Sequence, residues 1–134
     1  TPAADVALPV NLERLICATL GQDEALKYCW CCTEGESYAV PESMIDRLQK
    51  GMFGAVVSME RVSAIITSVY RSNQYILDPY AALAYGALSD FRSSTGSAAT
   101  ALLWMENSPL CNSTMVSGAL GMSAGELTRK LSEK

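Results

Sequence analysis

The 134-residue sequence contains no histidine. Catalytic pairs of serine or cysteine with histidine are therefore excluded. The sequence also lacks a basic stripe, since its net charge is −4 and both signs are scattered along it. Nothing favours contact with the phosphates of a nucleic acid. No apolar run approaches the roughly 20 residues that a membrane-spanning helix needs, so we expect neither nucleic acid nor membrane as a partner.

Charged residues are scarce, at 18% of the chain, against about 25% in ordinary soluble domains. Hydrophobic residues make up 49%. This balance predicts a surface that is partly covered, by a partner or by further sequence of the same protein. The length suits a single region, 1–134, that is one domain or part of a larger one. The chain opens with Thr1 and shows no secretion signal, so we expect a processed or partial chain.

The five cysteines do not suggest disulfides, because their number is odd and three of them are crowded together. Reduced thiols in a cytoplasmic protein fit better. The C-x-C-C run at residues 29–32 lacks the usual C-x2-C spacing of zinc sites and has no second pair nearby. We interpret these cysteines as small buried hydrophobic residues on a helix. A cysteine-based metal or redox module is the weaker alternative, and no metal site is predicted.

Other catalytic patterns are missing as well. The stretch GMFGAV has neither the spacing nor the flanking strand of a phosphate-binding loop. The acidic pairs Asp23-Glu24 and Glu34-Glu36 are predicted to face solvent rather than to act together as acid and base. None of the four lysines has the apolar neighbours that would lower its pKa for a Schiff base. We therefore predict no catalytic residue within this chain.

Hydrophobic periodicity and end signals predict about six helices, drawn from seven candidate segments. Asn11, Ser58 and Asp78 are suitable N-cap residues, and Ser123 with Glu126 fits a capping box. Candidate helical segments are residues 11–21, 22–35, 40–51, 58–72, 78–91, 112–120 and 123–134.

Three short stretches favour β-structure, namely residues 5–10, 75–77 and 100–105 (TALLWM). Residues 92–99 (RSSTGSAA) are predicted to form a loop. Isolated strands between helices indicate a helix-rich α/β fold with two or three short strands. So few strands do not make a stable sheet alone, so we expect them to be covered by the chain's own helices or by self-association.

Four segments of the sequence, in order, resemble the motifs of one enzyme family. TPAADVALPVNLERLI is similar to the family's T-x-SPSMDI-x-x-SSN-ERLL. Residues 52–88, which include QYILDPYAALAY, are similar to F-x-G-x-x-V-S-x-EE-T-x-x-I-x-x-x-Y-x-x-x-GY-LLDPHTAVAY-x-x-L. SDFRSSTGSAATALLWMENSPLC resembles DYR-x-x-TGD-x-x-PTVVLSTASPYKF, and VSGALG matches VL-x-ALG. The chain is identified by this resemblance as the C-terminal part of a threonine synthase or of a threonine-synthase-like protein.

The resemblance implies a partial tryptophan-synthase-β-like fold that binds pyridoxal phosphate (PLP). It also implies a lyase of amino-acid biosynthesis that converts O-phospho-L-homoserine and water to L-threonine and phosphate, with PLP as the electron sink. The family's Schiff-base lysine and glycine-rich cofactor loop would precede Thr1. We therefore expect no bound PLP and no activity from this chain alone, and a partner in the missing N-terminal part. The alternative is a non-catalytic relic or interaction domain.

The resemblance also suggests site residues. Asp78 and Pro79 keep the first two residues of the family's DPHTA, while Tyr80 replaces its histidine, and these three are expected to form one wall of the active site. Glu106 aligns within one residue with the threonine expected at the PLP pyridine nitrogen, and Ser108 is a nearby hydroxyl. A hydroxyl leaves that nitrogen neutral, whereas a carboxylate would hold it protonated. Asp78 and Pro79 are first of all predicted to start a helix.

Overall fold

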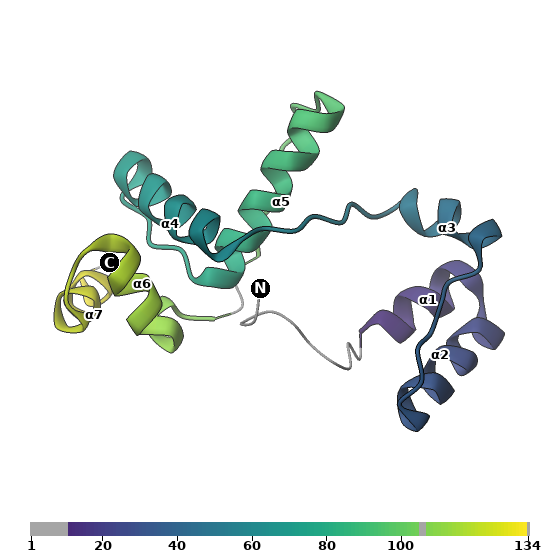
Figure 1. The fold of residues 1–134 in the computed structure, drawn as a ribbon. Coiled ribbons are helices and arrows are strands. Elements are labelled where there is room, and N and C mark those ends of the chain that lie inside the picture. Colours follow the sequence, from purple (N-terminus) through teal and green to yellow (C-terminus); the bar gives the residue numbers. More distant parts are fainter. Residues whose placement is uncertain (1–10, 105–106, 134) are drawn as a thin grey trace. The chain divides into compact units, whose positions relative to one another are not determined.

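The computed structural model describes residues 11–104 and 107–133, and each regular element within these ranges is a helix. The chain divides into two compact units, which we call the N-terminal unit (residues 11–53) and the C-terminal unit (residues 54–133). Figure 1 shows their helices coloured along the sequence.

The expected α/β fold with two or three strands is wrong, because residues 11–104 and 107–133 contain no strand. Residues 75–77 are irregular, and Ile76 and Leu77 are buried among helices rather than paired in a sheet. Residues 100–104 are also irregular, with Leu102 87% and Trp104 80% exposed. An extended segment becomes a strand only where a second one offers backbone hydrogen bonds, and no other described segment pairs with these residues. The predicted β-stretch at 5–10 and Met105 lie outside the described residues.

The N-terminal unit consists of α1 (Leu12–Leu20), α2 (Gln22–Glu34) and α3 (Glu42–Gln49). Gly21 separates α1 from α2 with φ +103°, a value that favours glycine. The two helices pack on each other, and α3 contacts α1 (Figure 1). Ile16, Ala25 and Tyr28 form the buried centre of this unit. Asn11 was predicted as an N-cap, but its side chain makes no capping hydrogen bond.

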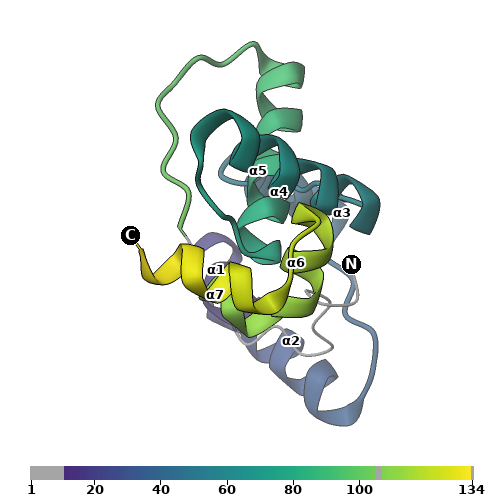
Figure 2. The same ribbon diagram turned by 90° about the vertical axis from the view of Figure 1, so that its left-hand side faces the viewer.

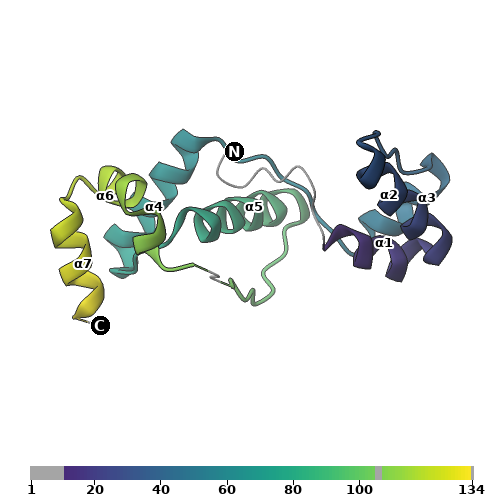
Figure 3. The same cartoon turned by 90° about the horizontal axis from the view of Figure 1, so that it is seen from below.

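The C-terminal unit consists of α4 (Met59–Asn73), α5 (Pro79–Thr95), the 3-10 helix η1 (Pro109–Asn112), α6 (Ser113–Leu120) and α7 (Ala124–Ser132). Helix α4 packs against both α5 and α6, and α7 packs against α6 (Figure 3). Thr67 strengthens the α4–α6 contact, because its hydroxyl lies 2.8 Å from the carbonyl oxygen of Ala119 near the end of α6. The core of the unit is formed by Val57, Val62, Ile66, Ile76, Leu77, Ala81, Ala82, Val116 and Leu127.

Most predicted helix ends agree with the structure. Ser58 accepts the amide of Arg61 at the start of α4, and Ser123 and Glu126 form the predicted capping box of α7. Helix α5 is longer than predicted, because it continues to Thr95 and stops at Gly96, where φ is +67°. The hydroxyls of its last serine and threonine residues donate to carbonyls one turn back, so they remain compatible with a helix.

Residues 97–104, which we call the return segment, lead from the end of α5 back towards η1 (Figure 2). Arg92 fixes its beginning, since the guanidinium donates to the carbonyl oxygen of Ala99 at 2.9 Å. Leu102 and Trp104 then extend into solvent.

Candidate functional site

The corner before α5 holds Asp78, Pro79 and Tyr80, the three residues that the resemblance suggests as a wall of an active site. Asp78 is fully buried, and its Oδ1 accepts the backbone amides of Tyr80 at 2.7 Å and Ala81 at 3.2 Å. Pro79 is the first residue of the helix and is also buried, where its missing N–H and fixed φ suit the position. Tyr80 is partly exposed. The predicted helix start is therefore confirmed in its atomic detail.

The second carboxylate oxygen of Asp78, Oδ2, is buried and has no hydrogen-bond partner in the protein. The carboxylate does lie at the positive end of α5, where a negative charge is favoured. Because Asp78 already takes the first free amides of this helix, the start of α5 has no room to bind a phosphate group. The starts of α4 and α7 are likewise capped by the chain's own side chains.

The chain enters this corner through an unusual backbone conformation at Gln74. Its φ of +55° and ψ of +26° place it in the left-handed region, and among the described residues it is the one non-glycine residue with positive φ. The Gln74 amide donates to the carbonyl oxygen of Tyr70 at 2.9 Å, and its side-chain amide reaches the same oxygen at 3.1 Å. Gln74 thus ends α4 and turns the chain towards the buried residues Ile76, Leu77 and Asp78.

Of the two residues predicted at the PLP pyridine nitrogen, Glu106 lies outside the described residues. Ser108 is exposed and caps η1, with its oxygen accepting the amide of Leu110 at 3.3 Å. This bond uses the oxygen as acceptor and leaves the hydroxyl hydrogen able to donate. Ser108 therefore fits the pyridine nitrogen of the cofactor in its chemistry, whereas the capped helix starts do not fit the cofactor's phosphate.

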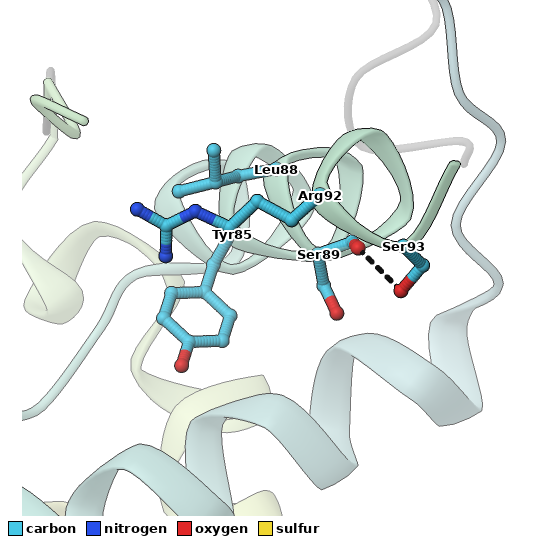
Figure 4. Close-up of a pocket in the computed structure, with 5 residues that line it drawn as sticks. All are labelled: Tyr85, Leu88, Ser89, Arg92 and Ser93. Carbon is cyan, nitrogen blue, oxygen red and sulfur yellow. Dashed lines mark hydrogen bonds between the residues drawn. The ribbon is translucent and has the colours of Figure 1, made fainter. Parts of the chain in front are cut away.

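A shallow cavity of about 310 Å³ lies along the exposed side of α5. Figure 4 shows the side chains that line it, all of them from this helix: Tyr85, Leu88, Ser89, Arg92 and Ser93. The Ser93 hydroxyl donates to the carbonyl oxygen of Ser89 at 2.9 Å, which is the dashed line in Figure 4. Arg92 also holds the return segment. Two of the five lining side chains, Arg92 and Ser93, thus already donate to backbone carbonyl oxygens of the protein.

A bidentate ion pair braces α4 against α5. The guanidinium of Arg61 donates to both carboxylate oxygens of Asp90, at 2.6 and 2.8 Å. It also lies 3.4 Å from the carbonyl oxygen of Gly86. The hydrogen bonds from Arg61 lower the pKa of Asp90. This pair positions the two helices that form the corner at Asp78.

The N-terminal unit contains a polar cluster that the sequence interpretation missed. Glu24 was predicted to face solvent, but it is buried and accepts hydrogen bonds from Lys27 at 2.5 Å and from the Tyr38 hydroxyl at 3.0 Å. These two bonds lower the pKa of Glu24, while burial and the bond to Glu24 raise the pKa of Tyr38. Tyr38 also meets Tyr28 edge to face, with ring centroids 5.4 Å apart. The spacing of Glu24 and Lys27 on one helix face was a signal for their pairing.

The cysteines occupy separate environments, and all five thiols are free. Cys17 and Cys111 are exposed, whereas the three cysteines of residues 29–32 are half-buried. Cys29 donates to Glu13 at 3.4 Å, and this contact raises the pKa of its thiol. In the part of the chain that the structure describes, no three side chains of the metal-binding types come together.

No model of a known protein family matches this sequence, and no solved structure matches the chain. None of the helices within the described residues has the length and apolar character to cross a membrane.

Proposed function

We propose that this chain is the C-terminal part of a PLP-dependent threonine synthase, which converts O-phospho-L-homoserine and water to L-threonine and phosphate. The chain is not active by itself and needs the part of the protein that carries the Schiff-base lysine and the cofactor's phosphate site. Because the described residues form no sheet, the proposal depends on the motif residues and on their local backbone.

The observation that carries the proposal is the left-handed conformation of Gln74. In the threonine synthase motif GY-LLDPHTAVAY, glycine stands where this chain has Gln74. Glycine adopts positive φ without a steric penalty, whereas other residues rarely do so. The backbone of this chain therefore has, at that position, the conformation for which the motif's glycine is suited.

The packing of the C-terminal unit supports the same proposal. Its buried core comes mainly from the residues that the resemblance covers: Val57, Ile66, Ile76, Leu77 and Ala82 belong to the second segment, and Val116 opens the closing VSGALG. The likeness thus includes residues on which the folding of the unit depends, as well as exposed ones.

Within this proposal the residues of the chain have distinct roles. Asp78 and Pro79 fix the start of α5 and so position Tyr80 at the surface of the wall. Ser108 donates a hydrogen bond to the pyridine nitrogen, or Glu106 holds that nitrogen protonated. When bound, PLP supplies the electron sink for a β,γ-replacement.

The test is an assay of phosphate release from O-phospho-L-homoserine in the presence of PLP. The complete protein that contains this chain is expected to release phosphate and L-threonine in equal amounts, and the 134-residue chain alone to release none. Ser108→Ala and Glu106→Gln, made separately in the complete protein, should identify the pyridine partner through the pH dependence of the cofactor's absorbance. Ser72→Ala, an exposed change at the end of α4, is the matched control.

Two results would contradict the proposal. One is a complete protein that binds PLP but leaves O-phospho-L-homoserine intact. The other is phosphate release by the chain alone, which would show that the required groups lie within it.

The return segment favours a second candidate function, which is a non-catalytic interaction domain. Leu102 and Trp104 expose large apolar side chains, and apolar surface of this kind marks contact with another polypeptide. The partner would be the rest of the same protein or a second copy of the chain. A complete protein that is inactive with O-phospho-L-homoserine, yet loses self-association on Leu102→Lys, would favour this candidate over the enzyme.

A further inference from the structure

A groove of about 590 Å³ lies within the N-terminal unit, between α2 and the segment of residues 36–41 that follows it. Its walls include Leu26, Trp30, Tyr38 and Pro41, with the Glu24–Lys27 pair beside them. Trp30 is 61% and Leu26 59% exposed. Large apolar side chains at the edge of a hollow are typical anchors of a binding surface.

The wall of this groove that Tyr38 forms is held in place before any ligand arrives. The Glu24 carboxylate joins α2 to Tyr38 through the hydrogen bonds already described. Tyr38 is further fixed by its edge-to-face contact with Tyr28. A preformed wall reduces the ordering that binding would otherwise require.

Charge indicates the kind of ligand. Residues 11–53 carry seven acidic and four basic side chains, a net charge of −3, whereas residues 54–134 carry six of each. Three further acidic residues are neighbours of residues that line the groove. Asp23 lies near enough to raise the pKa of Lys27, after the larger effect of Glu24; Glu34 follows Trp30 by one helical turn, and Glu36 precedes the lining residue Ser37. One wall cation, Lys27, is already paired with Glu24.

We propose that this groove binds a short basic segment of a partner protein, with an apolar or arginine side chain against Trp30 and further cations near Glu34 and Glu36. An exposed tryptophan ring attracts arginine and lysine through its face. Complementary charge around an apolar anchor gives such a contact its specificity and its sensitivity to salt. This inference is independent of the enzymatic proposal.

The experiment is a selection from phage-displayed random nonapeptides on the complete 134-residue chain, with subtraction on the Trp30→Ala variant. Peptides that bind the wild-type chain but not Trp30→Ala are expected to be enriched and to carry a net positive charge. The most enriched peptide is then titrated against a Trp104→Phe chain, whose remaining tryptophan, Trp30, reports binding by fluorescence.

Trp30→Ala is expected to weaken binding of this peptide at least tenfold. Because this variant lacks Trp30, its binding is measured by the fluorescence of a labelled peptide. The double variant Glu34→Gln/Glu36→Gln should weaken it several-fold and make its affinity less dependent on salt. The matched control is Glu60→Gln/Glu133→Gln, which removes the same charge from exposed positions of the other unit and should change nothing. Since Trp30, Glu34 and Glu36 are exposed, circular dichroism should show that each variant keeps its helices.

Enrichment of neutral or acidic peptides would overturn the proposal, as would a failure to enrich any peptide that depends on Trp30. Equal loss of affinity in the control double variant would also overturn it, because binding would then respond only to the total charge. Self-association that Trp30→Ala abolishes would assign the groove to a second copy of the chain instead.

Discussion

Arg61 and Asp90 form a two-point ion pair, in which the two guanidinium nitrogens lie 2.6 and 2.8 Å from the two carboxylate oxygens. Arg61 is in the first turn of α4, and Asp90 is 29 residues further along the chain, in α5. Parallel hydrogen bonds of this kind fix the relative position of two helices more strictly than a single contact does. The pair therefore holds together the two helices between which the Asp78 corner is formed.

This pair predicts how stability changes with pH. Arg61 lowers the pKa of Asp90 in the folded chain, so the stabilisation is present above the unfolded-state pKa of about 3.9. It is lost as the pH falls through the lower pKa of the folded state. The wild-type chain should be more stable than Asp90→Asn at pH 7, and this advantage should disappear at acid pH.

Urea unfolding of both chains between pH 2 and 7 measures this difference. Because the Arg61–Asp90 pair is partly exposed, 1 M salt should reduce the stability difference between the two chains at pH 7. Asp46→Asn, an exposed change on α3, is the control. A difference between wild type and Asp90→Asn that stays constant over the whole pH range would contradict the prediction.

Gly86 is required at the crossing of α4 and α5 because a larger residue does not fit. A Cβ atom added there would lie 2.9 Å from one methyl group of Val57 and 3.1 Å from the end of Ile65. Val57 is buried and has a stiff side chain. Overpacking of this kind costs about 1–3 kcal/mol, more than the roughly 1 kcal/mol that alanine gains over glycine in a helix.

Gly86→Ala should therefore lower the free energy of unfolding by about 1 kcal/mol, as the net of these two effects. The matched change is Gly118→Ala in α6, where an added Cβ would meet nothing within 4 Å. That variant should gain up to about 1 kcal/mol. Denaturant unfolding of Gly86→Ala and Gly118→Ala tests both predictions. If both substitutions change the free energy of unfolding in the same direction, the close contact at Gly86 does not determine the effect of an added Cβ.

The sequence was sufficient to predict elements whose signals are local. Ser58, Asp78 and the Ser123–Glu126 box each act within one turn of their own helix, and the structure has all three. The strand predicted at residues 100–105 depended on a neighbour far away in the chain, and residues 100–104 have no such neighbour within 11–104 and 107–133. An apolar run by itself does not distinguish a buried strand from an exposed connection.

In the candidate site, too, local features were predictable from the sequence, whereas features that depend on distant contacts were not. The capping role of Asp78 was predictable from the residue pair, but its unpartnered Oδ2 depends on how the whole unit packs around it. Glu24 was misjudged because its main distant partner, Tyr38, is 14 residues away in an irregular segment. The spacing of Glu24 and Lys27 along α2 predicts that they pair, but it does not predict that Glu24 is buried.

Gln74 offers a direct test of backbone strain. A non-glycine residue in the left-handed region loses about 1 kcal/mol relative to glycine, and Gln74 has φ +55°. Gln74→Gly should therefore raise the free energy of unfolding by about 0.5–1 kcal/mol. Gln74→Val should lower it, since a β-branched residue tolerates this conformation least.

Gln74→Ala separates strain from the loss of side-chain contacts, because the side-chain amide also reaches the Tyr70 carbonyl. Thermal unfolding of the three variants should rank them as glycine, then alanine, then valine. If Gln74→Gly and Gln74→Ala are both less stable than the wild-type chain, the side-chain contact and not the backbone conformation dominates at this corner.

Asp78 combines a favourable cap with an unfavourable buried oxygen, and two substitutions separate these effects. Asp78→Ala removes the acceptor of the Tyr80 and Ala81 amides and should lower the free energy of unfolding by about 1–2 kcal/mol. Asp78→Ser keeps a capping oxygen and removes the buried Oδ2, which has no partner. Both substitutions remove the unpartnered Oδ2, but only serine keeps an acceptor for the Tyr80 and Ala81 amides. The loss in Asp78→Ser should therefore be smaller than in Asp78→Ala. Denaturant unfolding at pH 7 measures both, and an equal loss in the two variants would mean that the carboxylate acts through its charge at the end of α5 rather than through the cap.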